Sequence, residues 1–230
     1  MTESRAFYAR SGSVWDDLVT LLHLPYTVWH LSYVAIGAGL APRLDWTILA
    51  GALLAFFFGL GIGAHALDEV RDRPLQTGLS NATLWVLGVG GLVAGGAVGV
   101  AGAFVISPWL LVWVAAGLAL AAGYALEGSP LLHSDWGFAV AWGAFPVLVG
   151  YWAQSETLSL AAIFAAAAAT VLSRAQRELS TPARRIRRAD VPIAVEGWTR
   201  DELLSTWERA LRLLSVAMPL LALGLLAGHL

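Results

Sequence analysis

The chain alternates between long apolar runs and short polar connections. Most of the runs approach the roughly 20 apolar residues that an α-helix needs to cross the hydrocarbon core of a bilayer. The pattern therefore predicts an all-α, polytopic membrane protein, a helical bundle with about seven transmembrane helices. The predicted spans are 26–40, 46–66, 82–106, 109–126, 136–153, 157–173 and 211–226.

The same pattern indicates one integral membrane domain that covers residues 1–230. Its first part is a polar tail followed by an amphipathic helix, which we expect to lie in the membrane interface. The predicted parts are the tail and interfacial helix at 1–24, six spans at 25–173, a cytoplasmic basic loop at 174–204 and the seventh span at 205–230.

Composition supports a membrane protein and excludes several kinds of chemistry. Hydrophobic residues make up 58% of the chain and charged residues only 13%, and the mean hydropathy is +0.68. The chain has no cysteine, which excludes disulfides, a thiolate nucleophile and a cysteine-bound iron–sulfur cluster. It also has no lysine, so mechanisms that form a Schiff base on a lysine are excluded.

The arginines are distributed unevenly between the two sides of the predicted bundle. All 14 except Arg43 fall on the side of the N-terminus and of the loops after the even-numbered spans. The positive-inside rule places that side in the cytoplasm and the C-terminus outside, in a bacterial or archaeal plasma membrane. We expect membrane lipid as a partner and no nucleic acid. The cluster most typical of contact with anionic lipid is Arg184, Arg185, Arg187 and Arg188.

One glycine pattern in the third span concerns helix packing. Gly91, Gly95 and Gly99 recur every four residues and therefore share one helix face. Such a stripe is typical of helices whose backbones approach closely in a membrane, and space for a ligand is the alternative.

The most polar stretch near a membrane boundary is 65–78, directly after the second span. Asp68 and Asp72 are four residues apart, so a helix places both carboxylates on one face, and His65 falls on the same face. Charged groups at the edge of a bilayer are costly to keep, which makes them candidates for function. An ordinary solvated loop is the alternative.

This stretch resembles the first aspartate motif of the UbiA superfamily of intramembrane prenyltransferases. In that family, Asp-x-x-x-Asp ends the second membrane helix and an Arg-Pro-Leu-x-x-Gly loop follows. The second aspartate motif of the family has no match after the sixth span, where Gln176 and Glu178 stand nearest to its place. The residues that carry the resemblance are Asp68, Asp72, Arg73, Pro74, Leu75 and Gly78.

The resemblance implies a UbiA-like fold and a prenyltransferase that binds an isoprenoid diphosphate through Mg²⁺ at the cytoplasmic face. Asp68 and Asp72 would be the catalytic metal ligands, and His65 would be a third metal ligand beside them. Mg²⁺ suits this role because it prefers oxygen ligands and bridges one or two carboxylates to substrate phosphates. The resemblance also implies a lipid or aromatic acceptor for the prenyl group.

Candidate substrate-binding residues fall into two groups. Guanidinium groups match the oxygens of a diphosphate, and the arginines nearest to the expected site are Arg73, Arg174 and Arg177. Aromatic faces favour a developing cation, although ordinary packing explains such residues equally well. The aromatic candidates are Phe138, Trp142, Phe145 and Tyr124.

A second hypothesis uses histidines on the same scaffold. His30 and His65 lie near the cytoplasmic ends of adjacent spans. Imidazole nitrogens bind haem iron and other transition metals, so a non-catalytic or haem- or metal-binding membrane protein is the alternative to a transferase.

Overall fold

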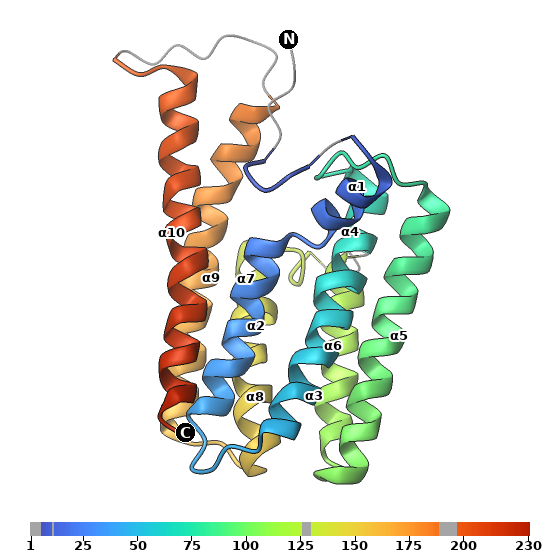
Figure 1. The fold of residues 1–230 in the computed structure, drawn as a ribbon, viewed down its shortest axis with the longest axis vertical. Coiled ribbons are helices and arrows are strands. Elements are labelled where there is room, and N and C mark those ends of the chain that lie inside the picture. Colours follow the sequence, from blue (N-terminus) through green and yellow to red (C-terminus); the bar gives the residue numbers. More distant parts are fainter. Residues whose placement is uncertain (1–5, 11, 126–129, 189–196) are drawn as a thin grey trace.

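The computed structural model describes residues 6–10, 12–125, 130–188 and 197–230, apart from the side chain of Asp72. In these ranges the chain is a bundle of helices joined by short connections (Figure 1). The helices are α1 (Val14–Leu21), α2 (Leu24–Gly39), α3 (Trp46–Phe56), η1 (Phe57–Ala64), α4 (His65–Asp72), α5 (Asn81–Val105), α6 (Leu110–Ala125), α7 (Asp135–Ala139), η2 (Val140–Ala144), α8 (Phe145–Ser155), α9 (Leu160–Arg187) and α10 (Arg200–Ala227).

Several helices continue into one another, so α2 through α10 make seven rods. One rod is α3–η1–α4 and another is α7–η2–α8. The all-α class and the count of seven helices are therefore confirmed. In the described part of the chain, four helices are long and apolar enough to cross a membrane, and α6 is a shorter apolar helix. The four are Trp46–Arg71, Asn81–Val105, Asp135–Ser155 and Arg200–Ala227.

The segment expected as a basic loop, 174–204, is helical at both ends. α9 continues to Arg187 although Pro182 lies inside it, and α10 already begins at Arg200, behind the capping box of Thr199. The extension follows from packing, because buried side chains recur along α9 at helical spacing beyond the apolar run. These buried residues are Ser173, Gln176, Ala183 and Ile186.

The centre of the bundle is α2, which packs closely against α8. A Cβ atom at Gly37 of α2 would lie 2.0 Å from the backbone oxygen of Val147. Conversely, a Cβ atom at Gly150 of α8 would lie 2.1 Å from the backbone oxygen of Val34. Each helix therefore uses a glycine to receive the backbone of the other, which is the small-residue contact typical of membrane helices.

The glycine stripe of α5 makes a similar contact on the other side of the bundle. A Cβ at Gly91 would lie 2.6 Å from the backbone nitrogen of Gly63, and one at Gly95 would lie 2.7 Å from the backbone oxygen of Ala55. The prediction of close packing is confirmed at these two positions.

Two rods change their winding near mid-length. η1 and η2 are π-helical segments between α-helical stretches, and both are rich in small residues. π-helical turns inside α-helices are rare and often lie at functional sites. Each of these two offers a backbone oxygen to a histidine, as described below.

We expect Gly37→Ala to destabilise the protein by about 1–3 kcal/mol, because the added methyl group overlaps the backbone of α8. The measurement is thermal unfolding in detergent. Gly51→Ala is the matched control, since a Cβ at Gly51 meets nothing within 4 Å. Equal unfolding temperatures for the two variants would contradict the close contact.

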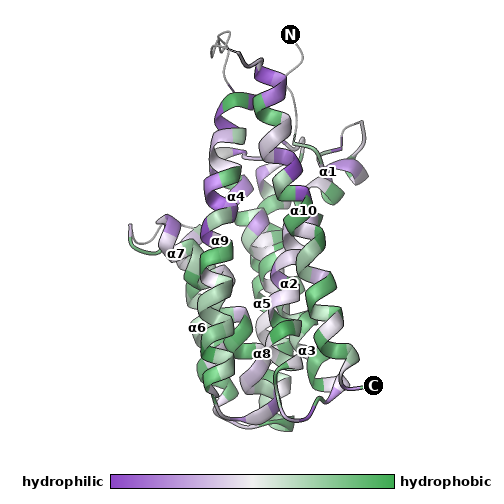
Figure 2. Cartoon of the chain, turned by 90° about the vertical axis from the view of Figure 1, so that its left-hand side faces the viewer, coloured by the Kyte–Doolittle hydropathy of each residue, from purple (hydrophilic) through white to green (hydrophobic). Residues whose placement is uncertain are grey.

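The loops between the rods lie at the two ends of the bundle. α1 and the last turns of α9 lie toward one end and the C-terminus lies at the other (Figure 1). Hydrophilic residues are concentrated toward the first end, while the remainder of the bundle is mostly hydrophobic (Figure 2). The assignment of the first end to the cytoplasm stays a prediction.

Single cysteines test that orientation, because the chain has none of its own. We expect Ser80→Cys, at the start of α5, to react with an impermeant maleimide only after the cells are opened. Thr157→Cys, in the exposed connection between α8 and α9, should react on intact cells. Labelling of both from the same side would contradict the arrangement of the rods.

Candidate functional site

A polar pocket lies toward the arginine-rich end of the bundle. Its volume is about 120 Å³. Seven of the candidate metal- or substrate-binding residues line it, namely His30, His65, Asp68, Tyr124, Phe138, Trp142 and Arg177. Residues from α2, α4, α6, α9 and the α7–η2 rod therefore meet here, although they are far apart in the sequence. Further lining residues are Tyr8, His23, Tyr26, Leu60, Ala64, Pro74, Leu75, Gln176, Ser180, Arg184 and Arg187.

Asp68 is the carboxylate that α4 presents to the pocket. It is partly buried, and it makes no hydrogen bond or ion pair with any residue that the structure describes. Arg184 and Arg177 are close enough to act on it electrostatically. Asp72 ends α4 one helical turn later, but its side chain lies outside the described residues. Its role as a second ligand therefore stays a prediction.

Arg184 is a partly buried cation on the pocket wall. Burial lowers the pKa of its guanidinium, the charge of Arg177 lowers it further, and Asp68 raises it. No carboxylate among the described residues forms an ion pair with it. A partly buried cation without an ion-pair partner favours association with an anion. The sequence favours contact with anionic lipid for Arg184, and its place on the pocket wall becomes visible only in the tertiary structure.

The other arginines of the pocket are partly neutralised by protein carboxylates. Nε of Arg177 lies 3.1 Å from Oδ1 of Asp135, and its guanidinium stacks on Phe138 at 5.2 Å from the ring centroid. Nε of Arg187 lies 3.6 Å from Oε1 of Glu208 on α10. Both cations nevertheless line the cavity, so the pocket gathers three guanidinium groups on α9.

Two arginines expected at the substrate do not line the pocket. Arg73 donates to the backbone oxygens of Thr77 and Leu79, at 3.2 and 2.7 Å, and to the side chain of Asn81. Arg174 pairs with Glu178 at 2.5 Å and approaches Asp135. Arg73 therefore holds its own loop, and Arg174 is neutralised by its neighbours.

Glu69 has a structural role that the sequence did not reveal. Its side chain is 0% exposed. Its two oxygens accept hydrogen bonds from the backbone nitrogens of Leu75 and Thr77, at 2.9 and 2.8 Å, and from the hydroxyl of Thr77 at 2.9 Å. The carboxylate thus folds the loop after α4 back onto the helix. Both of its oxygens are thereby engaged within the protein.

Three histidines, His23, His30 and His65, also line the pocket. Nδ1 of His30 lies 2.9 Å from the backbone oxygen of Trp142 in η2, and Nδ1 of His65 lies 3.2 Å from that of Gly61 in η1. His23 contacts the ring of His65 at 4.8 Å, and its Nε2 is bonded to the hydroxyl of Tyr8. Burial, followed by the neighbouring His65, lowers the pKa of His23.

The histidines and carboxylates do not form a ready metal centre. Within the described residues, no group of three or more histidines and carboxylates is arranged to hold a metal ion. This geometry offers little for a metal held by His30 and His65 through protein ligands alone. A magnesium site that is completed by substrate oxygens needs fewer protein ligands.

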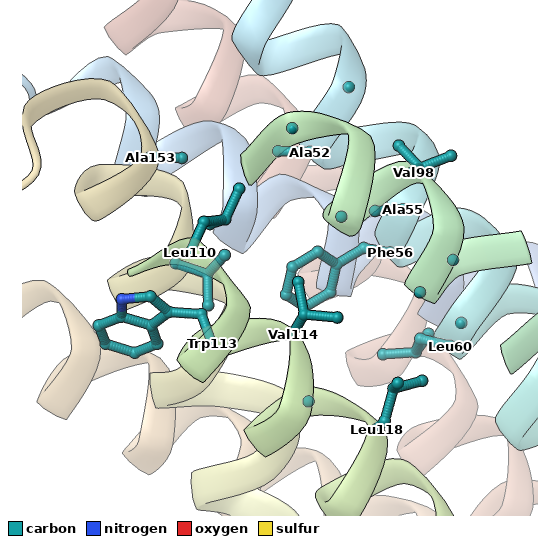
Figure 3. A pocket seen from close by; sticks show the side chains of 18 of the residues that line it. Ala52, Ala55, Phe56, Leu60, Val98, Leu110, Trp113, Val114, Leu118 and Ala153 are labelled. Carbon is teal, nitrogen blue, oxygen red and sulfur yellow. The ribbon is translucent and has the colours of Figure 1, made fainter. Parts of the chain in front are cut away.

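An apolar cavity of about 330 Å³ adjoins the polar pocket. Leu60 and Trp142 line both spaces. Figure 3 shows Phe56, Trp113 and other apolar side chains around the apolar cavity. The expected aromatic set is therefore divided. Phe138 and Tyr124 line the polar pocket, Phe145 lines the apolar cavity, and Trp142 stands between them.

Comparison of the chain with models of known protein families, with curated proteins and with solved structures found no match. Two features of the chain therefore bear on function, namely the two neighbouring spaces that share Leu60 and Trp142 and the aspartate motif of α4.

We expect Glu69→Gln to loosen the loop after α4 and to destabilise the protein by about 1.5–3 kcal/mol, because an amide replaces a charged acceptor. Hydrogen exchange should show lost protection at the amides of Leu75 and Thr77, which donate to Glu69. Glu178→Gln, at a largely exposed side chain, is the control and should leave these amides protected. Unchanged exchange in Glu69→Gln would contradict the anchoring role.

Proposed function

We propose that the chain is a UbiA-like membrane protein that binds an isoprenoid diphosphate through Mg²⁺ and transfers or ionises its prenyl group. The observation that carries the proposal is the direct neighbourhood of an arginine-lined polar pocket and a larger apolar cavity. A ligand that fills both needs an anionic head and a long hydrocarbon tail. An isoprenoid diphosphate has this form.

The head would lie against the arginines of α9. Guanidinium groups donate paired hydrogen bonds that fit phosphate oxygens. Arg184 offers a guanidinium without an ion-pair partner among the described residues, while Arg177 and Arg187 add donors from the same helix. These residues replace Arg73 and Arg174 in the proposed substrate contacts.

The residues near the head also fit a magnesium ion. Asp68 offers a carboxylate without a protein partner among the described residues, and Asp72 follows one turn later on α4. Mg²⁺ commonly uses one or two carboxylates together with substrate phosphates. When bound, the ion would neutralise charge on the diphosphate as it leaves. His65 is less suited to this ion, because imidazole prefers transition metals.

The aromatic side chains would act where head and tail meet. Trp142 lines both spaces, and its ring contacts that of Tyr124 at 5.7 Å between centroids. As the bond between the prenyl carbon and the diphosphate weakens, positive charge develops on the prenyl group. The electron-rich faces of these rings favour that charge, and the surrounding helices limit access of water.

A second candidate function is haem or transition-metal binding. One observation favours it, because the hydrogen bonds of His30 and His65 both engage Nδ1 and leave Nε2 for another partner. The lack of a ready metal centre among the described residues makes it the weaker candidate.

We expect magnesium with farnesyl diphosphate to raise the unfolding temperature of the protein in detergent, because a ligand that binds only the folded state stabilises it. The gain is about 2.7 kcal/mol at a ligand concentration of 100 times Kd. Arg184→Gln and Asp68→Asn should lose most of it. Arg185→Gln is the matched control, since Arg185 follows Arg184 on α9 but is exposed.

The outcome that would contradict the proposal is an unchanged unfolding temperature of the wild-type protein with this pair of ligands. A haem absorption band in the purified protein would then favour the histidine-centred candidate. Stabilisation that persists in Arg184→Gln would instead place the diphosphate elsewhere in the bundle.

A further inference from the structure

The chain before α1 crosses the arginine-rich end of the bundle as a short segment without regular secondary structure, residues 6–10, which we call the strap (Figure 1). On one side, the guanidinium carbon of Arg212 on α10 lies 4.6 Å from the ring centroid of Phe7. On the other side, the backbone nitrogen of Arg10 donates to Oγ1 of Thr20 on α1 at 2.8 Å. The strap therefore reaches from α10 to α1.

The middle of the strap forms part of the wall of the polar pocket, because Tyr8 lines it. The hydroxyl of Tyr8 lies 2.6 Å from Nε2 of His23. Its ring meets those of His23 and Tyr26 edge-on, with centroids 4.8 and 5.6 Å apart. Burial raises the pKa of Tyr8 and the neighbouring Tyr26 raises it further, while the charges of Arg187 and Arg184 lower it. Tyr8 thus lies toward the part of the pocket that holds these two guanidinium groups.

The way in which the strap is held allows it to open while the bundle stays folded. Phe7 and Tyr8 are only partly buried, and they pack against the bundle through their rings. The backbone nitrogen of Ala9 donates to the oxygen of Ala6 at 2.9 Å, so the strap is a turn that can move as a unit. Gly12, between the strap and α1, has a φ of 126°, which favours glycine. Segments with few buried apolar contacts are the ones that open locally.

We propose that the strap is a lid on the polar pocket, which opens to admit an anionic ligand from the aqueous phase and closes with Tyr8 against His23. Residues 6–10 contain no carboxylate, so the closed lid leaves the charges of Arg184 and Arg187 to the ligand. Closure also excludes water, which strengthens the electrostatic contacts inside the pocket. The lid follows from the contacts of the strap, whereas the identity of the anion as a diphosphate head rests on the proposed function.

Opening of the lid can be measured without any ligand, from the rate at which Ser180→Cys reacts with an anionic methanethiosulfonate in detergent. Ser180 lines the pocket on α9, and the chain has no cysteine of its own. We expect slow reaction with the native strap. Phe7→Ala removes the ring contact with Tyr8, at 5.1 Å between centroids, and the contact with Arg212. The reaction should become about tenfold faster, which corresponds to one aromatic pair and one cation–π contact.

A second variant leaves the strap itself unchanged. Arg212→Gln removes the cation–π contact with Phe7 and should raise the rate about two- to fivefold. Arg209→Gln is the matched control and should leave the rate unchanged, because Arg209 is an exposed arginine of α10 that donates to the backbone oxygen of Ser205 in its own helix. Ser80→Cys, exposed at the start of α5, reports general unfolding and should react equally fast with every strap variant.

Three results would overturn the lid. Reaction of Ser180→Cys as fast as that of Ser80→Cys with the native strap would show that the pocket is already open. An unchanged rate at Ser180→Cys in both Phe7→Ala and Arg212→Gln would show that the strap does not control access. A parallel rise at Ser80→Cys would attribute the faster reaction to general unfolding.

The proposed function is assessed separately, by adding magnesium and farnesyl diphosphate to the protein that carries Ser180→Cys and Phe7→Ala. A bound head group should slow the reaction, because the lid no longer limits it in this variant. Rates that depend on the strap without any protection by the ligand would support the lid while the diphosphate proposal fails. Protection by the ligand with rates that do not depend on the strap would overturn the lid alone.

Discussion

The close contact between α2 and α8 is the constraint on which the site depends. Gly37 and Gly150 allow each backbone to approach the other without an intervening side chain. His30 lies seven residues before Gly37, about two turns along the same face of α2. The glycines therefore set the separation at which Nδ1 of His30 reaches the backbone oxygen of Trp142. A bulkier residue at either glycine would move one wall of the pocket.

Several charged groups of the apolar bundle are held by hydrogen bonds or ion pairs within the protein. Glu69 is fully buried but receives three hydrogen bonds from the loop that follows it. The same loop is tied to α1, because the backbone nitrogen of Gly78 donates to Asp17 at 3.0 Å. Against this background the described surroundings of Asp68 and Arg184 differ, since neither is hydrogen-bonded there. Charged groups on a pocket wall that lack such a partner are the ones expected to associate with a ligand.

The division into a polar pocket for the head of the proposed ligand and an apolar cavity for its tail also follows from packing. α9 carries its arginines on more than one face, and only the face directed at the pocket becomes part of the site. The apolar cavity arises beside the small residues of α3, α5 and α6, which leave space where larger side chains would have filled the bundle. The two spaces meet at Leu60 and Trp142, so their combination suits a ligand with chemically different ends.

The sequence by itself determined the helical class, the number of rods and the presence of Asp68 at the end of an apolar rod, because apolar runs and their polar ends are local properties of the chain. It also indicated close packing along α5, since the spacing of Gly91 and Gly95 is itself a helix face. Which arginines serve the pocket was decided only by the tertiary structure. α9 extends beyond its apolar run, and its rotation against the neighbouring rods turns Arg184 inward while Arg174 meets Glu178. The burial of Glu69 and the hydrogen bonds of His30 and His65 likewise depend on backbone groups that a linear pattern does not bring together.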